Sequence, residues 1–165
     1  MRISRFLLAT TLLALLGSFT SAAHAADAPI KITSIAQIEV EVIGKDGKKT
    51  LKRTPPDKAV PGTEVIYTNT FENTGKKPAD NIVINNPIPN ESEYVAGSAF
   101  GKDCEILFSV DGGKKFGHAE ELKIKEADGK ERTALSREYT NIRWNYKGQL
   151  GAGKSGEVGF RATIK

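Results

Sequence analysis

Short runs in which apolar and polar residues alternate constrain the fold of this chain more than any other feature. Side chains two residues apart point to one face of an extended strand, whereas a helix needs a repeat of 3.6 residues. No helical repeat extends far beyond the N-terminal segment. The sequence therefore predicts an all-β fold. The apolar rows are Ile38, Val40 and Val42; Val65, Tyr67 and Phe71; Ile82 and Ile84; Cys104, Ile106, Phe108 and Val110; Leu122 and Ile124; Ile142, Trp144 and Tyr146; and Val158, Phe160, Ala162 and Ile164.

The turn-forming residues fall between these rows. Proline has no N–H to donate to a β-ladder, so we expect none of the seven prolines inside a strand. Asp46-Gly47 predicts a hairpin turn after the first row. Seven to nine short strands separated by such signals predict an antiparallel β-sandwich, with a closed barrel as the alternative. The prolines are Pro29, Pro55, Pro56, Pro61, Pro78, Pro87 and Pro89.

The N-terminal segment is typical of an export signal. Arg2 and Arg5 precede an apolar stretch over residues 6–19, and Ala23-His24-Ala25 places small residues where a signal peptidase requires them. An uncleaved anchor, the alternative, would need about 20 apolar residues. We therefore expect residues 1–25 to be a cleaved signal peptide, without stable membrane insertion afterwards. Residues 26–165 would form one periplasmic or secreted domain.

The chain offers few groups for catalysis. Residues 1–25 hold two of its 24 basic residues and one of its two histidines, so the remainder carries a weak positive charge and His118 alone. That charge gives little support for nucleic-acid binding. Cys104, the single cysteine, shares the spacing of an apolar row, so we expect it to be buried and inert. One His and one Cys cannot close a zinc site. We therefore expect no enzyme, no metal and no cofactor.

A spaced pattern of small and apolar residues over residues 61–165 resembles the bacterial conserved repeat domain, an immunoglobulin-like module of unknown function. The resemblance implies an immunoglobulin-like β-sandwich and no catalytic residues. The chain departs from the family pattern at Asn69, where the family has an aliphatic residue, and at Asn86, where it usually has aspartate. The matching positions are Pro61-Gly62, Tyr67, Phe71, Asn73-Thr74-Gly75, Pro78-Ala79, Ile82-Val83, Asn86-Pro87-Ile88-Pro89, Tyr94, Gly97-Ser98, Trp144, Leu150, Gly151, Gly153, Ser155, Val158 and Phe160.

Two readings of function remain open. The first is a non-enzymatic binding or structural module of the cell envelope, which would present surface loops, a sheet face or its basic hairpin to an envelope protein or glycan. The alternative for that hairpin is a solvated edge whose cations discourage strand pairing. The second reading is a small periplasmic glycan- or peptide-directed hydrolase, using two acids among Glu120, Glu121 and Glu126. The candidate binding residues are Lys45, Lys48, Lys49, Lys52 and Arg53.

One further segment has a recognisable pattern. Residues 109–116, SVDGGKKF, resemble the Asp-box hairpin of propeller proteins. A propeller needs several such segments and this chain has one. We therefore expect a structural turn in which Asp111 accepts hydrogen bonds from nearby backbone N–H groups.

Overall fold

The computed structural model describes residues 29–57 and 60–165, so the predicted signal peptide lies outside the described residues. In these two ranges the chain forms eleven strands and one short 3₁₀ helix, η1 (Ser136–Glu138). The all-β, sandwich-like prediction is confirmed. The number of strands exceeds the expected seven to nine because several strands have only two or three residues, too few to show alternation in the sequence.

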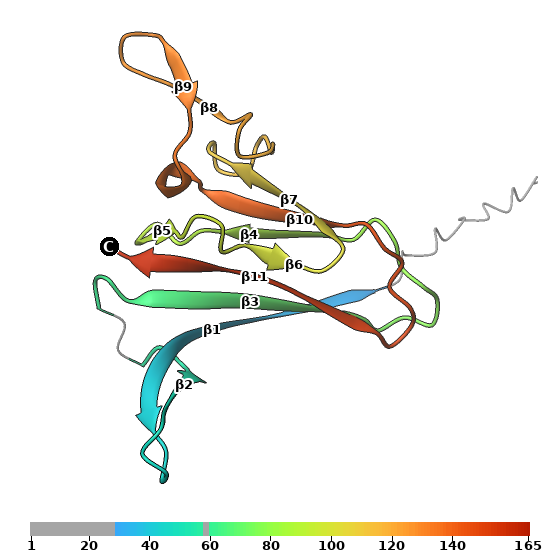
Figure 1. Cartoon of the computed structure of the whole chain (residues 1–165). Coiled ribbons are helices and arrows are strands. Elements are labelled where there is room, and N and C mark those ends of the chain that lie inside the picture. Colours follow the sequence, from blue (N-terminus) through green and yellow to red (C-terminus); the bar gives the residue numbers. More distant parts are fainter. Residues whose placement is uncertain (1–28, 58–59) are drawn as a thin grey trace, which may run out of the picture.

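The larger sheet has six strands, all paired antiparallel in the order β2-β1-β3-β11-β5, with β6 also pairing with β11 (Figure 1). Strand β11 therefore carries both β5 and β6 along its outer side. The strands are β1 (Ile30–Ile43), β2 (Lys49–Thr54), β3 (Glu64–Asn73), β5 (Ser92–Tyr94), β6 (Phe100–Gly101) and β11 (Ser155–Ile164).

The smaller sheet has three strands in the order β4-β10-β7 and faces the larger one. Two hairpins extend from this body in opposite directions, β8–β9 on one side and the outer part of β1 with β2 on the other (Figure 1). The remaining strands are β4 (Val83–Pro87), β7 (Cys104–Ser109), β8 (Lys123–Lys125), β9 (Glu131–Thr133) and β10 (Asn141–Tyr146).

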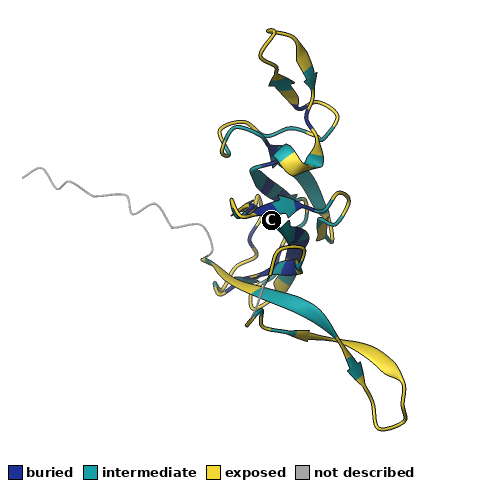
Figure 2. Ribbon diagram, turned by 90° about the vertical axis from the view of Figure 1, so that its left-hand side faces the viewer, coloured by how far each residue is buried: buried dark blue, intermediate teal, exposed yellow. Residues whose placement is uncertain are grey.

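The core lies between the two sheets, where the buried residues of Figure 2 gather. Trp144 and Ile142 of β10 are fully buried, as are Val158, Phe160 and Ala162 of β11. Their alternation in the sequence therefore identified two core-forming strands correctly. The aromatic rings of Trp144 and Phe160 lie 6.3 Å apart, so they join the two sheets.

Two sequence predictions need correction. Strand β4 ends on Pro87, although no proline was expected inside a strand. The exception is tolerated because β4 is an edge strand and needs no donor on its outer side.

The row from Cys104 to Val110 was expected to be buried, yet it is only half-buried. Its strand, β7, is also an edge strand, and its inner face borders a cavity described below.

Asn69 and Asn86, the two departures from the repeat-domain pattern, contact each other between the sheets. Asn69 is buried at 2% exposure, and its Nδ2 donates to Asn86 Oδ1 at 3.2 Å. Its Oδ1 accepts from Ser34 Oγ at 2.5 Å. An amide buried on an apolar face is thus paired on both its donor and acceptor sides, as a buried polar group requires.

We expect Asn69→Val to lower the free energy of unfolding by about 1–2 kcal/mol, because two side-chain hydrogen bonds are lost and the gain in apolar burial offsets only part of them. Urea unfolding of Asn69→Val, Asn86→Ala and the double variant checks this. A coupling of about 0.5–1.5 kcal/mol is expected between the two sites. A neutral or stabilising Asn69→Val, with no coupling to Asn86→Ala, would contradict it.

Candidate functional site

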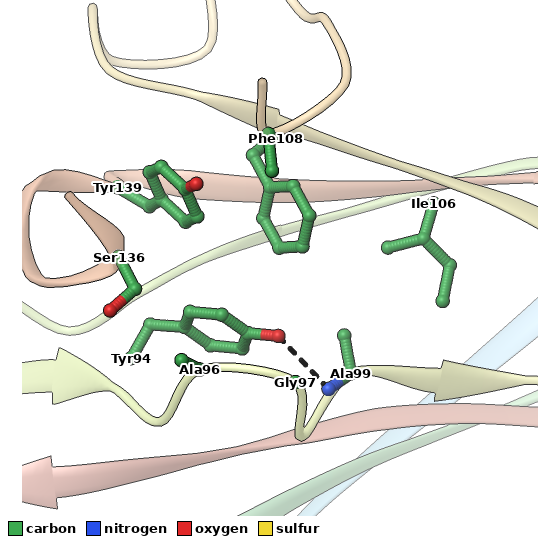
Figure 3. Close-up of a pocket in the computed structure, with 9 residues that line it drawn as sticks. Tyr94, Ala96, Gly97, Ala99, Ile106, Phe108, Ser136 and Tyr139 are labelled. Atoms are coloured by element: carbon green, nitrogen blue, oxygen red, sulfur yellow. Dashed lines mark hydrogen bonds between the residues drawn. The ribbon is translucent and has the colours of Figure 1, made fainter. Parts of the chain in front are cut away.

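An apolar cavity of about 330 Å³ opens where β5 and β6 of the larger sheet approach β7 of the smaller one (Figure 3). We call it the seam cavity. Residues from four separate segments meet there, and η1 with the residue after it closes one side. The lining residues are Tyr94, Ala96, Gly97, Ala99, Ile106, Phe108, Ala119, Ser136 and Tyr139.

Three aromatic rings form one wall of the seam cavity. Phe108 and Tyr139 stack with centroids 4.7 Å apart, and Tyr94 lies 5.3 Å from Phe108. The Tyr94 hydroxyl accepts a hydrogen bond from the Ala99 N–H at 3.1 Å (Figure 3). Burial, followed by the nearby Tyr94 and Glu120, raises the pKa of Tyr139, so its hydroxyl stays protonated. The wall is therefore neutral and suited to an apolar group.

The small residues opposite these rings create the open space. Ala96, Gly97 and Ala99 lie in the segment between β5 and β6, where larger side chains would fill the cavity. Gly97 has a φ of 73°, a backbone conformation that favours glycine. The local sequence thus turns the chain sharply and leaves room beside the rings.

An ion-pair cluster holds η1 against the β8–β9 hairpin. The Arg132 guanidinium donates to both carboxylate oxygens of Glu138, at 2.7 and 2.5 Å, and its Nε donates to Glu126 at 2.8 Å. Glu138 also accepts from the Leu135 N–H at 2.7 Å. These bonds, led by those from Arg132, lower the pKa of Glu138 to about 2. Because Glu138 directly precedes Tyr139, the cluster positions one wall of the cavity.

We expect the contribution of Glu138 to depend on pH. Its pKa in the folded state is below the ordinary value of 4.5, so its stabilising contribution is complete above that pH and is lost as pH falls towards about 2. The difference in Tm between wild type and Glu138→Gln should therefore shrink over this interval. Glu131→Gln, which removes an exposed carboxylate without an ion pair among the described residues, serves as the control. A constant difference for Glu138→Gln would contradict the assignment.

The basic residues predicted as a binding site all lie on or next to the β1–β2 hairpin, but they do not share one face. In the β1–β2 register Arg53 lies opposite Glu39, whereas Lys52 lies opposite Val40 on the other face. Several are also paired with carboxylates of the same hairpin. The anionic-surface site stays a prediction, with its charge divided and partly neutralised. The ion pairs are Lys48–Asp46 at 3.8 Å, Lys49–Glu41 at 2.7 Å and Arg53–Glu39 at 3.2 Å.

The predicted hairpin turn itself is confirmed. Gly47 has a φ of 77°, and the Lys48 N–H donates to Asp46 Oδ1 at 3.2 Å. At the base of the hairpin Arg161 of β11 donates to Glu39 at 3.1 Å and to Glu64 at 2.6 Å. These bonds connect the projecting hairpin to the body of the sandwich.

Two of the three acids that were candidates for hydrolysis have separate partners. Glu126 pairs with Arg132, and Glu121 accepts from the His118 N–H at 3.2 Å. Glu120 is exposed and lies in the turn before β8. Burial raises the pKa of the Cys104 thiol, which makes it a poor nucleophile.

Within residues 29–57 and 60–165 no group of three or more His, Cys, Asp or Glu side chains is arranged to hold a metal ion. In the same residues no helix is long and apolar enough to cross a membrane.

The Asp-box-like segment forms a self-contained turn. Asp111 Oδ1 accepts from the N–H groups of Lys114 and Lys115, each at 3.0 Å, and from Ser109 Oγ at 2.8 Å. Ser109 Oγ accepts in turn from the Gly113 N–H at 3.0 Å. These bonds, the one from Lys115 first, lower the pKa of Asp111. The Asp111 carboxylate therefore accepts hydrogen bonds from groups of its own turn, and this prediction from the sequence is confirmed.

The sequence predictions did not include the seam cavity. The alternation predicts a buried row for Ile106 and Phe108, and Tyr94 and Gly97 match only the family pattern. The available signal was an aromatic residue followed closely by small ones, Tyr94 to Ala99, but nothing in the sequence places that segment beside Tyr139.

Fold and site together define a small β-sandwich with an apolar cavity at the seam between its sheets. Comparison with protein-family models, with curated proteins and with solved structures gave no match to this chain. The resemblance to the conserved repeat domain therefore remains a prediction from the sequence.

Proposed function

We propose that this protein is a non-enzymatic binding module of the bacterial cell envelope, periplasmic or secreted, that takes an apolar group of its partner into the seam cavity. The observation that carries the proposal is the cavity itself. It measures about 330 Å³ and is bordered by Tyr94, Phe108 and Tyr139. Binding sites for small groups are commonly apolar hollows of this size with few polar contacts. The envelope location rests on the export signal predicted over residues 1–25.

The hydrolase alternative has less support. Hydrolysis of a glycan needs two carboxyl groups that converge on the substrate from opposite sides. The candidate acids do not line the seam cavity, and two of them are engaged elsewhere, Glu126 by Arg132 and Glu121 by the His118 N–H.

Retention of material from a native envelope extract tests the binding role. Ala119→Trp should block the seam cavity, because Ala119 lines it from a half-buried position outside the regular strands. Ala152→Trp places the same side chain on an exposed turn between β10 and β11, in a segment that does not line the cavity. We expect Ala152→Trp, but not Ala119→Trp, to retain the wild-type partner.

The hairpin prediction is tested in the same experiment. If the partner instead uses the basic residues, replacing Lys48, Lys49 and Lys52 by serine should weaken retention, as should raised salt, which screens exposed charges over about 8–10 Å. If Ala119→Trp retains the partner and the triple serine variant loses it, the binding site is the hairpin and not the seam cavity. Cleavage of a peptidoglycan or peptide substrate, abolished by mutating one carboxylate, would contradict the non-enzymatic role.

Export has its own test. We expect the form recovered from the periplasm or medium to begin at Ala26, because cleavage should follow Ala25. Intact-mass measurement of that form gives the first residue directly. A recovered chain that still contains Arg5 would contradict cleavage at this position.

A further inference from the structure

Strand β7 has an outer edge that is only partly paired. On β7, Glu105 and Ser109 direct their backbone N–H and C=O groups towards β10. The neighbouring bond from the Lys147 N–H to the Asp103 carbonyl oxygen fixes this assignment, because every second residue of a strand bonds to the same side. In an antiparallel strand the intervening residues direct their N–H and C=O groups to the other side. Phe108 uses both groups there, in bonds of 2.9 and 3.0 Å with Gly117.

The next residue in this alternation, Ile106, lacks such a partner. Among the residues that the structure describes, neither a strand nor a turn bonds to its outward N–H and C=O groups. An unpaired strand edge of this kind can accept the backbone of another chain.

The same residue connects the unpaired edge with the seam cavity. Ile106 presents its backbone to the outer edge of β7, while its side chain lines the cavity together with that of Phe108 (Figure 3). Across the opening lie Ala96, Gly97 and Ala99, which leave the mouth of the cavity wide. A strand laid along Ile106 would therefore place one side chain at this mouth, because neighbouring strands lie about 4.8 Å apart and align their side chains.

We propose that the partner is an extended peptide segment that adds a strand to the outer edge of β7 at Ile106 and inserts one apolar or aromatic side chain into the seam cavity. This inference rests on the proposed binding function. Strand addition of this type takes affinity from main-chain hydrogen bonds and specificity from a pocket for one side chain. The unpaired backbone groups distinguish a peptide from a small apolar molecule, which could fill the cavity but could not satisfy Ile106.

The charge beside the cavity further defines the segment. Glu120, which follows the lining residue Ala119, makes no ion pair among the described residues, and its charge contributes to the raised pKa of Tyr139. Glu105, next to Ile106 in the chain, is already matched by Lys147 at 2.7 Å. The unmatched carboxylate favours a segment with basic or neutral residues beside its apolar anchor and disfavours acidic ones.

Binding of a small peptide set to ¹⁵N-labelled protein tests the proposal. The probes are capped peptides Lys-Thr-X-Thr-X-Thr-Lys in which X is Val, Leu, Phe or Trp. We expect at least one to bind, and to slow the hydrogen exchange of the Ile106 amide, because that N–H gains an acceptor. The same peptide N-methylated at the amides that face β7 should bind about tenfold more weakly or worse, the equivalent of losing one or two hydrogen bonds.

Variants of the protein locate the site. Ala119→Trp should abolish binding of the best peptide, and Ala152→Trp should leave it unchanged. Binding that N-methylation does not weaken, or that leaves the exchange of Ile106 unaltered, overturns strand addition. So does the absence of binding by every peptide. If no peptide binds but Ala119→Trp loses a partner captured from envelope extract, the proposed binding function still holds. If Ala119→Trp retains that partner, both the binding function and strand addition are contradicted. A dimer in sedimentation that Ala119→Trp dissociates would make a second copy the occupant and also overturn the proposal.

Discussion

Replacing Trp144 by alanine is expected to lower the free energy of unfolding by about 3–5 kcal/mol, the range for truncating a large core side chain. Trp144 is fully buried in β10, the central strand of the smaller sheet. Its neighbours in the ladder are Ile84 of β4 and Ile106 of β7, and Phe160 lies opposite in the larger sheet. Removal of the indole would leave a void between the sheets. A domain of this size has about 5–15 kcal/mol in total, so much of its stability would be lost.

The indole nitrogen allows a sharper comparison. Trp144 Nε1 is buried and has no hydrogen-bond partner among the described residues. A buried N–H without a partner costs about 1–3 kcal/mol, and phenylalanine removes that group while it keeps most of the apolar volume. Trp144→Phe should therefore cost clearly less than Trp144→Ala. Urea unfolding of the wild type and both variants is followed by far-UV circular dichroism. Tryptophan fluorescence would not serve, because Trp144 is the single tryptophan and both variants lack it. Equal losses in both variants would contradict this account, and an unchanged Trp144→Ala would show that the residue is not part of the core.

The sequence was most informative for strands in which the alternating apolar residues are buried on one face of the sheet. Ile142, Trp144, Val158 and Phe160 follow a period of two and lie fully buried on strands that have neighbours on both sides. Turn chemistry was equally reliable at Asp46-Gly47, because a left-handed glycine and a side-chain acceptor determine the turn locally. Predictions of this kind succeed because the residues that determine them are close in the chain.

Features that depend on distant segments were missed. Alternation assigns a row to a strand but does not show whether that strand is central or at an edge, so Cys104 and Ile106 were expected to be buried. The seam cavity needs Tyr94, Phe108 and Tyr139 together, which only the sheet topology achieves. The grouped cations of the hairpin were similarly divided by the register between β1 and β2, which places Lys52 and Arg53 on opposite faces.

Asn73 shows how a residue noted only for its place in a pattern can act as a structural connector. It is fully buried at the end of β3. Its Nδ2 donates to the carbonyl oxygens of Lys77 at 2.7 Å and of Leu150 at 2.8 Å, and its Oδ1 accepts from the Gly75 N–H at 2.9 Å. One amide thus satisfies three backbone groups from the turn after β3 and from the loop before β11.

We expect Asn73→Ala to lower the free energy of unfolding by about 1–3 kcal/mol, because the Gly75 N–H and the Lys77 carbonyl oxygen lose their partner and a buried polar group without one costs about 1–3 kcal/mol. The Leu150 carbonyl oxygen still accepts from the Ala79 N–H at 2.9 Å, and the more exposed turn can recover part of the loss from water. Asn73→Asp is the matched test, because it preserves the shape and the acceptor for Gly75 but directs a carboxylate at two carbonyl oxygens. The introduced carboxyl should have a raised pKa in the folded state, so the deficit of Asn73→Asp should shrink as pH falls and the group gains a proton to donate. Asn73→Ala offers no such recovery. Urea unfolding of both variants over a pH series measures this difference, and parallel pH profiles for the two would show that the hydrogen bonds donated by Asn73 are not what stabilises this end of the sandwich.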